Sequence, residues 1–356
     1  MFCSQLFVTL PPKFKDMKKT KKLFLLPFAV CVLAVLFFTY YYFFSGFSNS
    51  DQTEYVYVDS DDNVDSVLMK LEPVATRHGM TGFSTLARHA GYADAIHTGR
   101  YPVNPGESAF KLLRRLKGGQ QEAMHLVMPE SRTVEILSGQ LSRKLMADSA
   151  SLLNTFTDAA LLQEMGYDTA TVMALFVPNT YDVYWDVTPQ RLMERMEREN
   201  KAFWNEKRLT AADTLGLTPI EVCTLASIID EETANNQEKP MIAGMYLNRL
   251  KAGMPLQADP KVKFAMRRFE LRRVYRDMLN YDSPWNTYRN VGLPPGPIKI
   301  ASQAGIDAVL NRVEHDYLYM CAKEDFSGTH NFARTYKEHQ ENAARYSKAL
   351  NERGVK

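Results

Sequence analysis

Hydrophobic and polar positions along this chain predict short strands and amphipathic helices in mixed order. Residues 54–58 alternate as Glu-Tyr-Val-Tyr-Val, the pattern of a half-buried strand, and residues 124–128 and 317–322 predict two more strands. Residues 328–332 are expected to form a loop. Apolar residues three and four apart predict helices over residues 64–78, 82–90, 108–117, 133–146, 151–165, 189–209, 219–232, 240–250, 302–313 and 333–351. Pro73 and Gly79 are expected to interrupt the helical pattern of the first two stretches. The sequence therefore predicts an α+β fold.

The N-terminal region departs from this pattern. Residues 23–44 form a run of 22 residues without a charged side chain, rich in Leu, Phe, Val and Tyr. A helix rises ~1.5 Å per residue, so this run would span roughly 33 Å, which is close to the thickness of a bilayer's hydrocarbon core. The run therefore predicts one transmembrane helix.

Charges beside this run predict its orientation. Residues 1–22 form a basic tail with six lysines and a single acid, Asp16. Positive charge marks the cytoplasmic side, so the tail is expected in the cytoplasm and the rest of the chain outside. A cleaved signal peptide is the alternative. Its apolar region is usually ~7–15 residues and ends in small residues, whereas this run ends in Tyr-Tyr-Tyr-Phe-Phe. An uncleaved anchor is therefore favoured.

The chain after the anchor divides into a linker and two folded regions. Residues 45–53 are a short polar linker. Residues 54–125 combine a strand, helices and a second strand, which is the order and size of a small α/β module. Residues 126–356 are expected to form a larger mixed α+β domain. The alternative is that residues 54–125 are simply the N-terminal lobe of that domain.

Composition and charge exclude several classes of function. The 356 residues carry a net charge of +2, and the basic tail alone supplies about +5, so the folded regions are mildly acidic. A mildly acidic surface argues against nucleic-acid binding. No two of the four cysteines have the spacing of a metal site, so no metal is predicted. The chain also lacks a P-loop and the G-x-G-x-x-G, H-E-x-x-H and G-x-S-x-G motifs, and no cofactor is predicted.

The helix predicted over residues 219–232 carries the strongest candidate for chemistry. Thr218 and Glu221 form a T-x-x-E capping box around Pro219, which suits the first helical position. An apolar stripe follows at helical spacing, and Glu232 continues it by one turn, whereas Asp230 and Glu231 are expected to point away. The stripe consists of Val222, Leu225, Ala226 and Ile229.

A carboxyl at the edge of an apolar face can act as a general acid. It loses hydration, which raises its pKa and lets it hold a proton near neutral pH. The polar and aromatic residues that follow Glu232 resemble the lining that glycan cleavage uses. Standard glycosidases need two carboxyl groups, whereas a lyase that uses the sugar's own hydroxyl can work with one. The alternative is an acidic helix end that faces solvent.

Several motifs in fixed order give a specific resemblance. They are Leu-Ala-Ser-Ile-Ile-Asp-Glu-Glu-Thr at 225–233, Asn-Arg-Leu at 248–250, Gly-Met-Pro-Leu-Gln-Ala-Asp-Pro at 253–260, Asn-Thr-Tyr at 286–288 and Gly-Leu-Pro-Pro-Gly-Pro-Ile at 292–298. Over roughly residues 54–350 the chain resembles the YceG-like family of endolytic murein transglycosylases. In that family the last acid of the first motif is catalytic, which is Glu232 here. The first acid is usually Glu but is Asp230 here, so a secondary role is expected for it.

The resemblance implies a function, a site and a location. The substrate would be the peptidoglycan glycan strand, cut non-hydrolytically between N-acetylmuramic acid and N-acetylglucosamine by a single-pass protein of the cell inner membrane with a periplasmic catalytic domain. Residues 54–125 would be a LysM-like module, and peptidoglycan synthases are expected partners. Substrate-binding residues would be Glu238, Asn248, Gln257, Asp259, Asn286, Tyr288 and His330.

Two alternative functions remain open beside this interpretation. One is a non-catalytic scaffold of the wall-synthesis machinery that binds peptidoglycan. The other is a glycan hydrolase in which Glu232 and Asp259 form a carboxylate pair.

Overall fold

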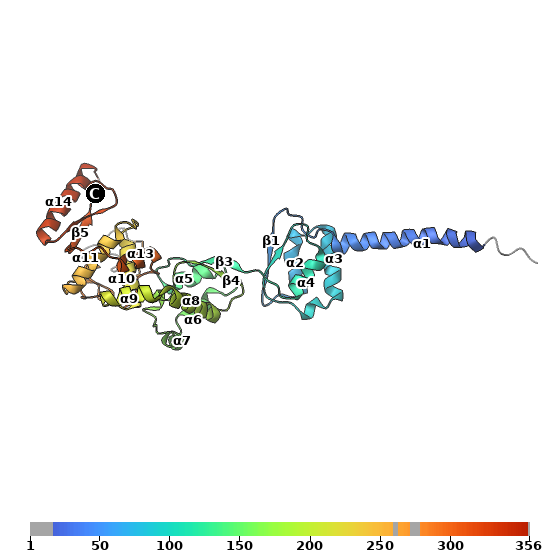
Figure 1. Ribbon diagram of the computed structural model, residues 1–356, viewed down its shortest axis with the longest axis horizontal. Helices are drawn as coiled ribbons and strands as arrows, with labels where there is room; N and C mark the ends of the chain where they lie inside the picture. The colour runs from blue at the N-terminus through green and yellow to red at the C-terminus, as the bar shows by residue number, and fades with distance from the viewer. Residues whose placement is uncertain (1–16, 259–262, 271–277, 355–356) are drawn as a thin grey trace, which may run out of the picture. The chain divides into compact units, whose positions relative to one another are not determined.

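The computed structural model describes residues 17–258, 263–270 and 278–354 and divides into two compact units, Met1–Ala123 and Met124–Lys356. Figure 1 shows the order of their helices and strands. Both units mix helices with short two-stranded antiparallel sheets, which confirms the predicted α+β class.

The first unit begins with a long apolar helix. α1 spans Met17–Thr39 and continues into the short π-helix η1, Tyr40–Phe44. Apolar side chains such as Leu26, Phe28 and Leu33 are exposed along it. In the described part of the chain, Leu26–Phe44 is long and apolar enough to cross a membrane, judged by length and composition alone.

The rest of the first unit packs helices on one pair of antiparallel strands. β1, Glu54–Val58, pairs antiparallel with β2, Gly99–Val103, so the predicted first strand is confirmed. The helices that enclose the core are α2, Val64–Leu71, α3, Arg77–His89, and α4, Ala109–Lys117.

Of the two predicted helix breaks in this unit, one is confirmed and one is wrong. The break at Pro73 is confirmed, because α2 ends at Leu71 and Pro73 lies in a separate 3-10 turn, Glu72–Val74. Gly79 was expected to interrupt a helix but lies inside α3. A Cβ at Gly79 would come within 2.9 Å of the Phe47 Cα, so the missing side chain permits close packing rather than a break.

The second unit contains two further strand pairs. β3, Met124–Val127, pairs with β4, Thr180–Val183, and β5, Tyr319–Ala322, pairs with β6, His330–Ala333. Residues 328–332 were predicted as a loop, and this is wrong for residues 330–332, which belong to β6. Four residues are too few to show a strand pattern by themselves, and pairing with β5 decides their conformation.

Two helices predicted as continuous are broken by polar caps. Residues 151–165 form two helices because Asp158 caps the second, and residues 189–209 break where Asn205 caps the next. The helices in the described part of this unit include α5 Val134–Leu141, α6 Ser149–Phe156, α7 Ala159–Glu164, α8 Pro189–Phe203, α9 Glu206–Leu215, α10 Pro219–Glu232, α11 Lys239–Lys251, α13 Gln303–Leu310 and α14 Tyr336–Glu352.

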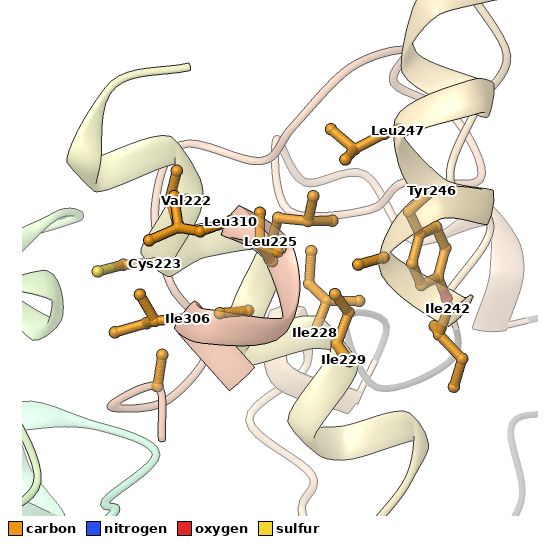
Figure 2. Packing of buried hydrophobic residues seen from close by; sticks show 14 of the residues in the cluster. Val222, Cys223, Leu225, Ile228, Ile229, Ile242, Tyr246, Leu247, Ile306 and Leu310 are labelled. Carbon is orange, nitrogen blue, oxygen red and sulfur yellow. The ribbon is translucent and has the colours of Figure 1, made fainter. Parts of the chain in front are cut away.

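The centre of the second unit is α10. Its apolar side chains from Val222 to Ile229 are buried, and Figure 2 shows Ile228 and Ile229 between α11, with Ile242 and Tyr246, and α13, with Ile306. Burial is wider than the predicted stripe, because α11 and α13 cover different sides of α10. α10 is thus held rigidly, and with it the three acids at its end.

Two glycines provide a matched test of this packing. A Cβ at Gly244 in α11 would lie 2.3 Å from the Val313 carbonyl oxygen, whereas one at Gly139 in α5 meets nothing within 4 Å. Gly244→Ala is therefore expected to destabilise the second unit by about 1–3 kcal/mol through overpacking. Gly139→Ala should stabilise it by roughly 0.5–1 kcal/mol.

Urea unfolding measures both changes. All three tryptophans lie in the second unit, so tryptophan fluorescence reports on that unit. Equal effects of the two substitutions would contradict the packing described for α11.

Candidate active site

The three acids at the end of α10 have three different environments. The helix itself starts as predicted, because the Thr218 hydroxyl accepts from the Glu221 N–H and the Glu221 carboxylate accepts from the Thr218 N–H at 2.8 Å. From this fixed start, the helix carries Asp230, Glu231 and Glu232 into contact with different partners.

Asp230 is buried and serves the fold. Its side chain is only 3% exposed and pairs with Lys239 Nζ at 2.7 Å. It also accepts from the backbone N–H and the hydroxyl of Ser302, which caps α13. Asp230 does point away from the apolar stripe, but it reaches another buried interface, where it joins α10 to α11 and α13. A Cβ at Gly305 would lie 2.6 Å from this carboxylate, so glycine is needed beside it.

Glu231 lies on a second side of the helix. Its carboxylate pairs with Arg132 at 2.8 Å and lies 3.7 Å from Lys299. Arg132 lies just before α5, and Lys299 directly follows the Pro-Gly segment at 292–298. Glu231 thus connects α10 to two neighbouring segments.

Glu232 forms part of the wall of a cavity of about 360 Å³. Tyr246 of α11 donates its hydroxyl to Glu232 Oε1 at 3.0 Å. Burial, and next the nearby Glu232 charge, raise the pKa of Tyr246 well above its usual value, so the phenol stays protonated and remains a donor. The cavity volume is within the range of small-ligand sites.

Three predicted binding residues share this cavity with Glu232. Gln257, Tyr288 and His330 come from three separate segments and all line it. Gln257 has φ of 51°, in the left-handed region that side chains other than glycine seldom adopt. Its N–H donates to the Thr287 carbonyl at 3.1 Å. Strained backbone of this kind concentrates at ligand sites.

Glu238 lies behind His330 and is 7% exposed. Its carboxylate accepts from the His330 N–H at 2.6 Å and contacts His330 Nδ1 at 3.0 Å. Glu238 is not among the residues that line the cavity. It orients the imidazole that does.

Two predicted residues have contacts that shape the walls instead. The Asn248 amide donates to the carbonyls of His315 and Tyr317. The fully buried Asn286 donates to the carbonyls of Leu279 and Tyr281, both at 2.8 Å. Neither asparagine lines the cavity. Asp259 lies outside the described residues.

Sequence reasoning missed three polar residues of the cavity: Tyr246, Arg249 and His339. The buried Arg249 donates to the Leu318 carbonyl at 2.6 Å and the Leu256 carbonyl at 2.9 Å. Burial lowers the pKa of His339, and Arg249 lowers it further, so this imidazole is neutral at pH 7. Arg249 belongs to the Asn-Arg-Leu motif and could have been found there, whereas His339 follows no motif.

The arrangement suits acid–base chemistry on a polar ligand. One carboxyl, two phenols, two imidazoles, a guanidinium and an amide line the same cavity. Among the described residues, no group of three or more His, Cys, Asp or Glu side chains could hold a metal ion.

Comparisons with known proteins agree with these motifs. The YceG-like family model matches residues 56–345. A Bacillus subtilis (strain 168) protein named endolytic murein transglycosylase is 41% identical over 133 residues, which is 37% of this chain and 36% of that protein. A protein of the same name from Streptococcus pneumoniae serotype 2 is 27% identical over 335 residues, or 84% of this chain and 59% of that protein. The chain spans less than two thirds of both relatives.

A solved structure is similar in fold. The crystal structure of a YceG-like protein from Listeria monocytogenes gives a TM-score of 0.53 at 24% identity, covering 82% of this chain and 99% of that one. The family model covers most of the present chain, from the first strand of the first unit to α14 of the second. The chain therefore belongs to the YceG-like family.

Proposed function

We propose that this chain is an endolytic lytic transglycosylase of peptidoglycan that leaves 1,6-anhydro ends on the strands it cuts. The observation that supports this proposal most directly is that Glu232 is the single carboxyl among the described residues that line the cavity. One carboxyl suffices when the substrate supplies its own nucleophile, whereas hydrolysis by two carboxyl groups needs a second one nearby. The names of the two relatives support the same activity.

In the proposed reaction Glu232 acts first as an acid and then as a base. The protonated carboxyl gives its proton to the glycosidic oxygen as the bond from that oxygen to the muramyl C1 breaks. The carboxylate then takes the proton of the muramyl 6-hydroxyl as that oxygen bonds to C1. No water is consumed, and Glu232 ends protonated, ready for the next cut. Tyr246 orients the carboxyl through Oε1 throughout.

The remaining residues of the cavity would hold the sugars. Gln257, Tyr288 and His330 offer an amide, a phenol and an imidazole to hydroxyl and acetamide groups. Glu238 would fix His330, and Asn248 and Asn286 would support the walls through their backbone contacts. The hydrolytic alternative would need Asp259 as the second carboxyl.

The location and the first unit belong to the same proposal. The exposed apolar surface of α1 would be covered by lipid, and the six lysines of residues 1–22 would keep the N-terminus in the cytoplasm. The second unit, which would be the catalytic unit, would then act on the outer side of the cell membrane, in the periplasm. Residues 54–125 would serve as a LysM-like glycan-binding module, with peptidoglycan synthases as partners.

Product analysis tests the reaction. The full chain in detergent, incubated with uncrosslinked glycan strands, should release shorter strands whose muramyl ends lack one water and resist borohydride reduction. Reducing ends would instead support the hydrolase. Binding without any new ends would support the scaffold. Either outcome would contradict the proposal.

Tyr246→Phe tests the contact to the general acid. A hydrogen bond to a charged group contributes about 1.5–3 kcal/mol, so its loss is expected to lower kcat about 10- to 150-fold with little change in KM. The initial rate of anhydro-end formation measures this. Tyr184→Phe, at an exposed position of the same unit, is the control. An unchanged kcat in Tyr246→Phe would mean that this contact does not orient the acid.

A further inference from the structure

A second cavity of about 430 Å³ lies in the catalytic unit and shares no lining residue with the cavity at Glu232. Its walls come from the start of α5, from the segment around the 3-10 turn η4, Val172–Ala174, and from residues 264–267. Trp285 and Pro297 complete it. Its volume is in the range of ligand sites, and the proposed function gives it no role.

This second cavity is connected to the end of the catalytic helix. A smaller pocket of about 90 Å³ shares Arg132 and Phe264 with it and includes Glu231. Arg132 joins the two spaces and pairs with Glu231 at 2.8 Å. Since Glu231 directly precedes Glu232, the smaller pocket and the catalytic cavity lie against neighbouring residues of the last turn of α10. A substituent on a sugar bound at Glu232 would reach the second cavity past this turn and the smaller pocket.

The lining combines cations with an apolar wall. Across the two pockets, Arg132, Lys263 and Arg267 outnumber the carboxylates of Glu135 and Glu231. Both carboxylates already pair with arginines, Glu231 with Arg132 and Glu135 with Arg267 at 3.0 Å. The excess positive charge and the exposed guanidinium of Arg267 favour an anionic ligand.

Apolar and hydroxyl groups fill out the rest of the site. The rings of Phe264 and Trp285 lie 4.8 Å apart between centroids and form one wall together with Met173. Thr157 and Thr169 add hydroxyls. Arg267 has φ of 52°, an unusual backbone state for arginine that is typical of residues held for ligand contact. Methyl groups beside carboxylates, as in a short acidic peptide, suit this lining better than an uncharged sugar.

We infer that this second cavity binds the acidic stem peptide that muramyl residues of peptidoglycan carry. The inference rests on the proposed function, because the peptide reaches the cavity as a substituent of the bound strand. Arg267 would bind a peptide carboxylate, and Arg132 would extend the same positive surface toward α10. The enzyme would accordingly prefer strands that carry peptides over strands from which an amidase has removed them.

The neighbouring arginines allow a matched experiment. Arg267 lines the cavity, whereas Arg268 does not and pairs with Glu270 outside it. With the full chain in detergent, Arg267→Gln should raise KM for peptide-bearing strands about fivefold and leave kcat and the KM for stripped strands unchanged. Arg267→Glu should raise it about tenfold or more. Arg268→Gln and Arg268→Glu should change neither.

A binding measurement makes the test independent of catalysis. The isolated stem peptide, titrated while tryptophan fluorescence is followed, should bind the wild type about fivefold more tightly than Arg267→Gln. If no strand is cleaved but this difference is found, the proposed function fails and the peptide site stands. If the Arg267 variants affect both strands equally, or bind the peptide as the wild type does, the cavity does not recognise the peptide.

Discussion

Glu232→Gln is expected to abolish the formation of anhydro ends while leaving the fold intact. A general acid accelerates such reactions about 10²- to 10⁴-fold, so kcat should fall by that factor. Glutamine keeps the size of the side chain and can still accept from the Tyr246 hydroxyl, but it has no proton of suitable acidity to give. Mass spectrometry of digested glycan strands measures the loss, and tryptophan fluorescence in urea checks the fold.

The neighbouring acid is the control for this substitution. Glu231 lies one residue earlier but pairs with Arg132 and does not line the catalytic cavity. Glu231→Gln should retain activity within about tenfold of the wild type, because it loses an ion pair rather than the proton donor. If Glu231→Gln were as inactive as Glu232→Gln, the assignment of the acid by position would be wrong.

Asp230→Ala is expected to destabilise the second unit by about 3–5 kcal/mol. The carboxylate is 3% exposed, and its removal leaves the Lys239 ammonium, 7% exposed, without its ion-pair partner. The substitution also removes the carboxylate oxygen that accepts a hydrogen bond from the Ser302 N–H. Urea unfolding followed by tryptophan fluorescence measures the change, since the three tryptophans all lie in this unit.

A double variant separates the free-energy cost of the unpaired buried charge from the cost of lost packing. Asp230→Ala combined with Lys239→Met replaces the unpaired ammonium by an apolar side chain and should recover part of the stability. A loss of less than about 1 kcal/mol in Asp230→Ala alone would show that this pair does not join α10 to α11. The pairing would then be no reason for the rigid position of Glu232.

Local signals in the sequence were sufficient for the catalytic helix. The capping box at Thr218 and Glu221 and the spacing of the apolar residues fixed both the helix and the side of Glu232. These are interactions between residues three or four apart, which a sequence displays directly. The first strand, Glu54–Val58, was predictable for the same reason, because its alternation lies within five residues.

Features that depend on distant partners could not be read in this way. β6 exists because it pairs with β5, and Asp230 is buried because α13 and Lys239 meet it there. Breaks in helices were missed where Asp158 and Asn205 act as caps, since either residue could also occupy an exposed helical position.

The candidate site was likewise predictable where a motif marked a residue, and not where tertiary packing alone placed it. The motifs identified Gln257, Tyr288 and His330, which do meet Glu232 at one cavity. They did not reveal that Asn248 and Asn286 turn their amides to backbone carbonyls. Tyr246 and His339 reach the cavity only through the packing of α11 and α14, for which the chain carries no local signal.

Cleavage in water enriched in ¹⁸O tests the central claim, that one carboxyl cuts the strand without hydrolysis. In the proposed reaction the muramyl 6-oxygen takes the place that water would occupy, so products of the wild type should carry no ¹⁸O at the new ends, and Glu232→Gln should give no products. Incorporation of one ¹⁸O at each new muramyl end, or cleavage by Glu232→Gln at the rate of the wild type, would contradict the account.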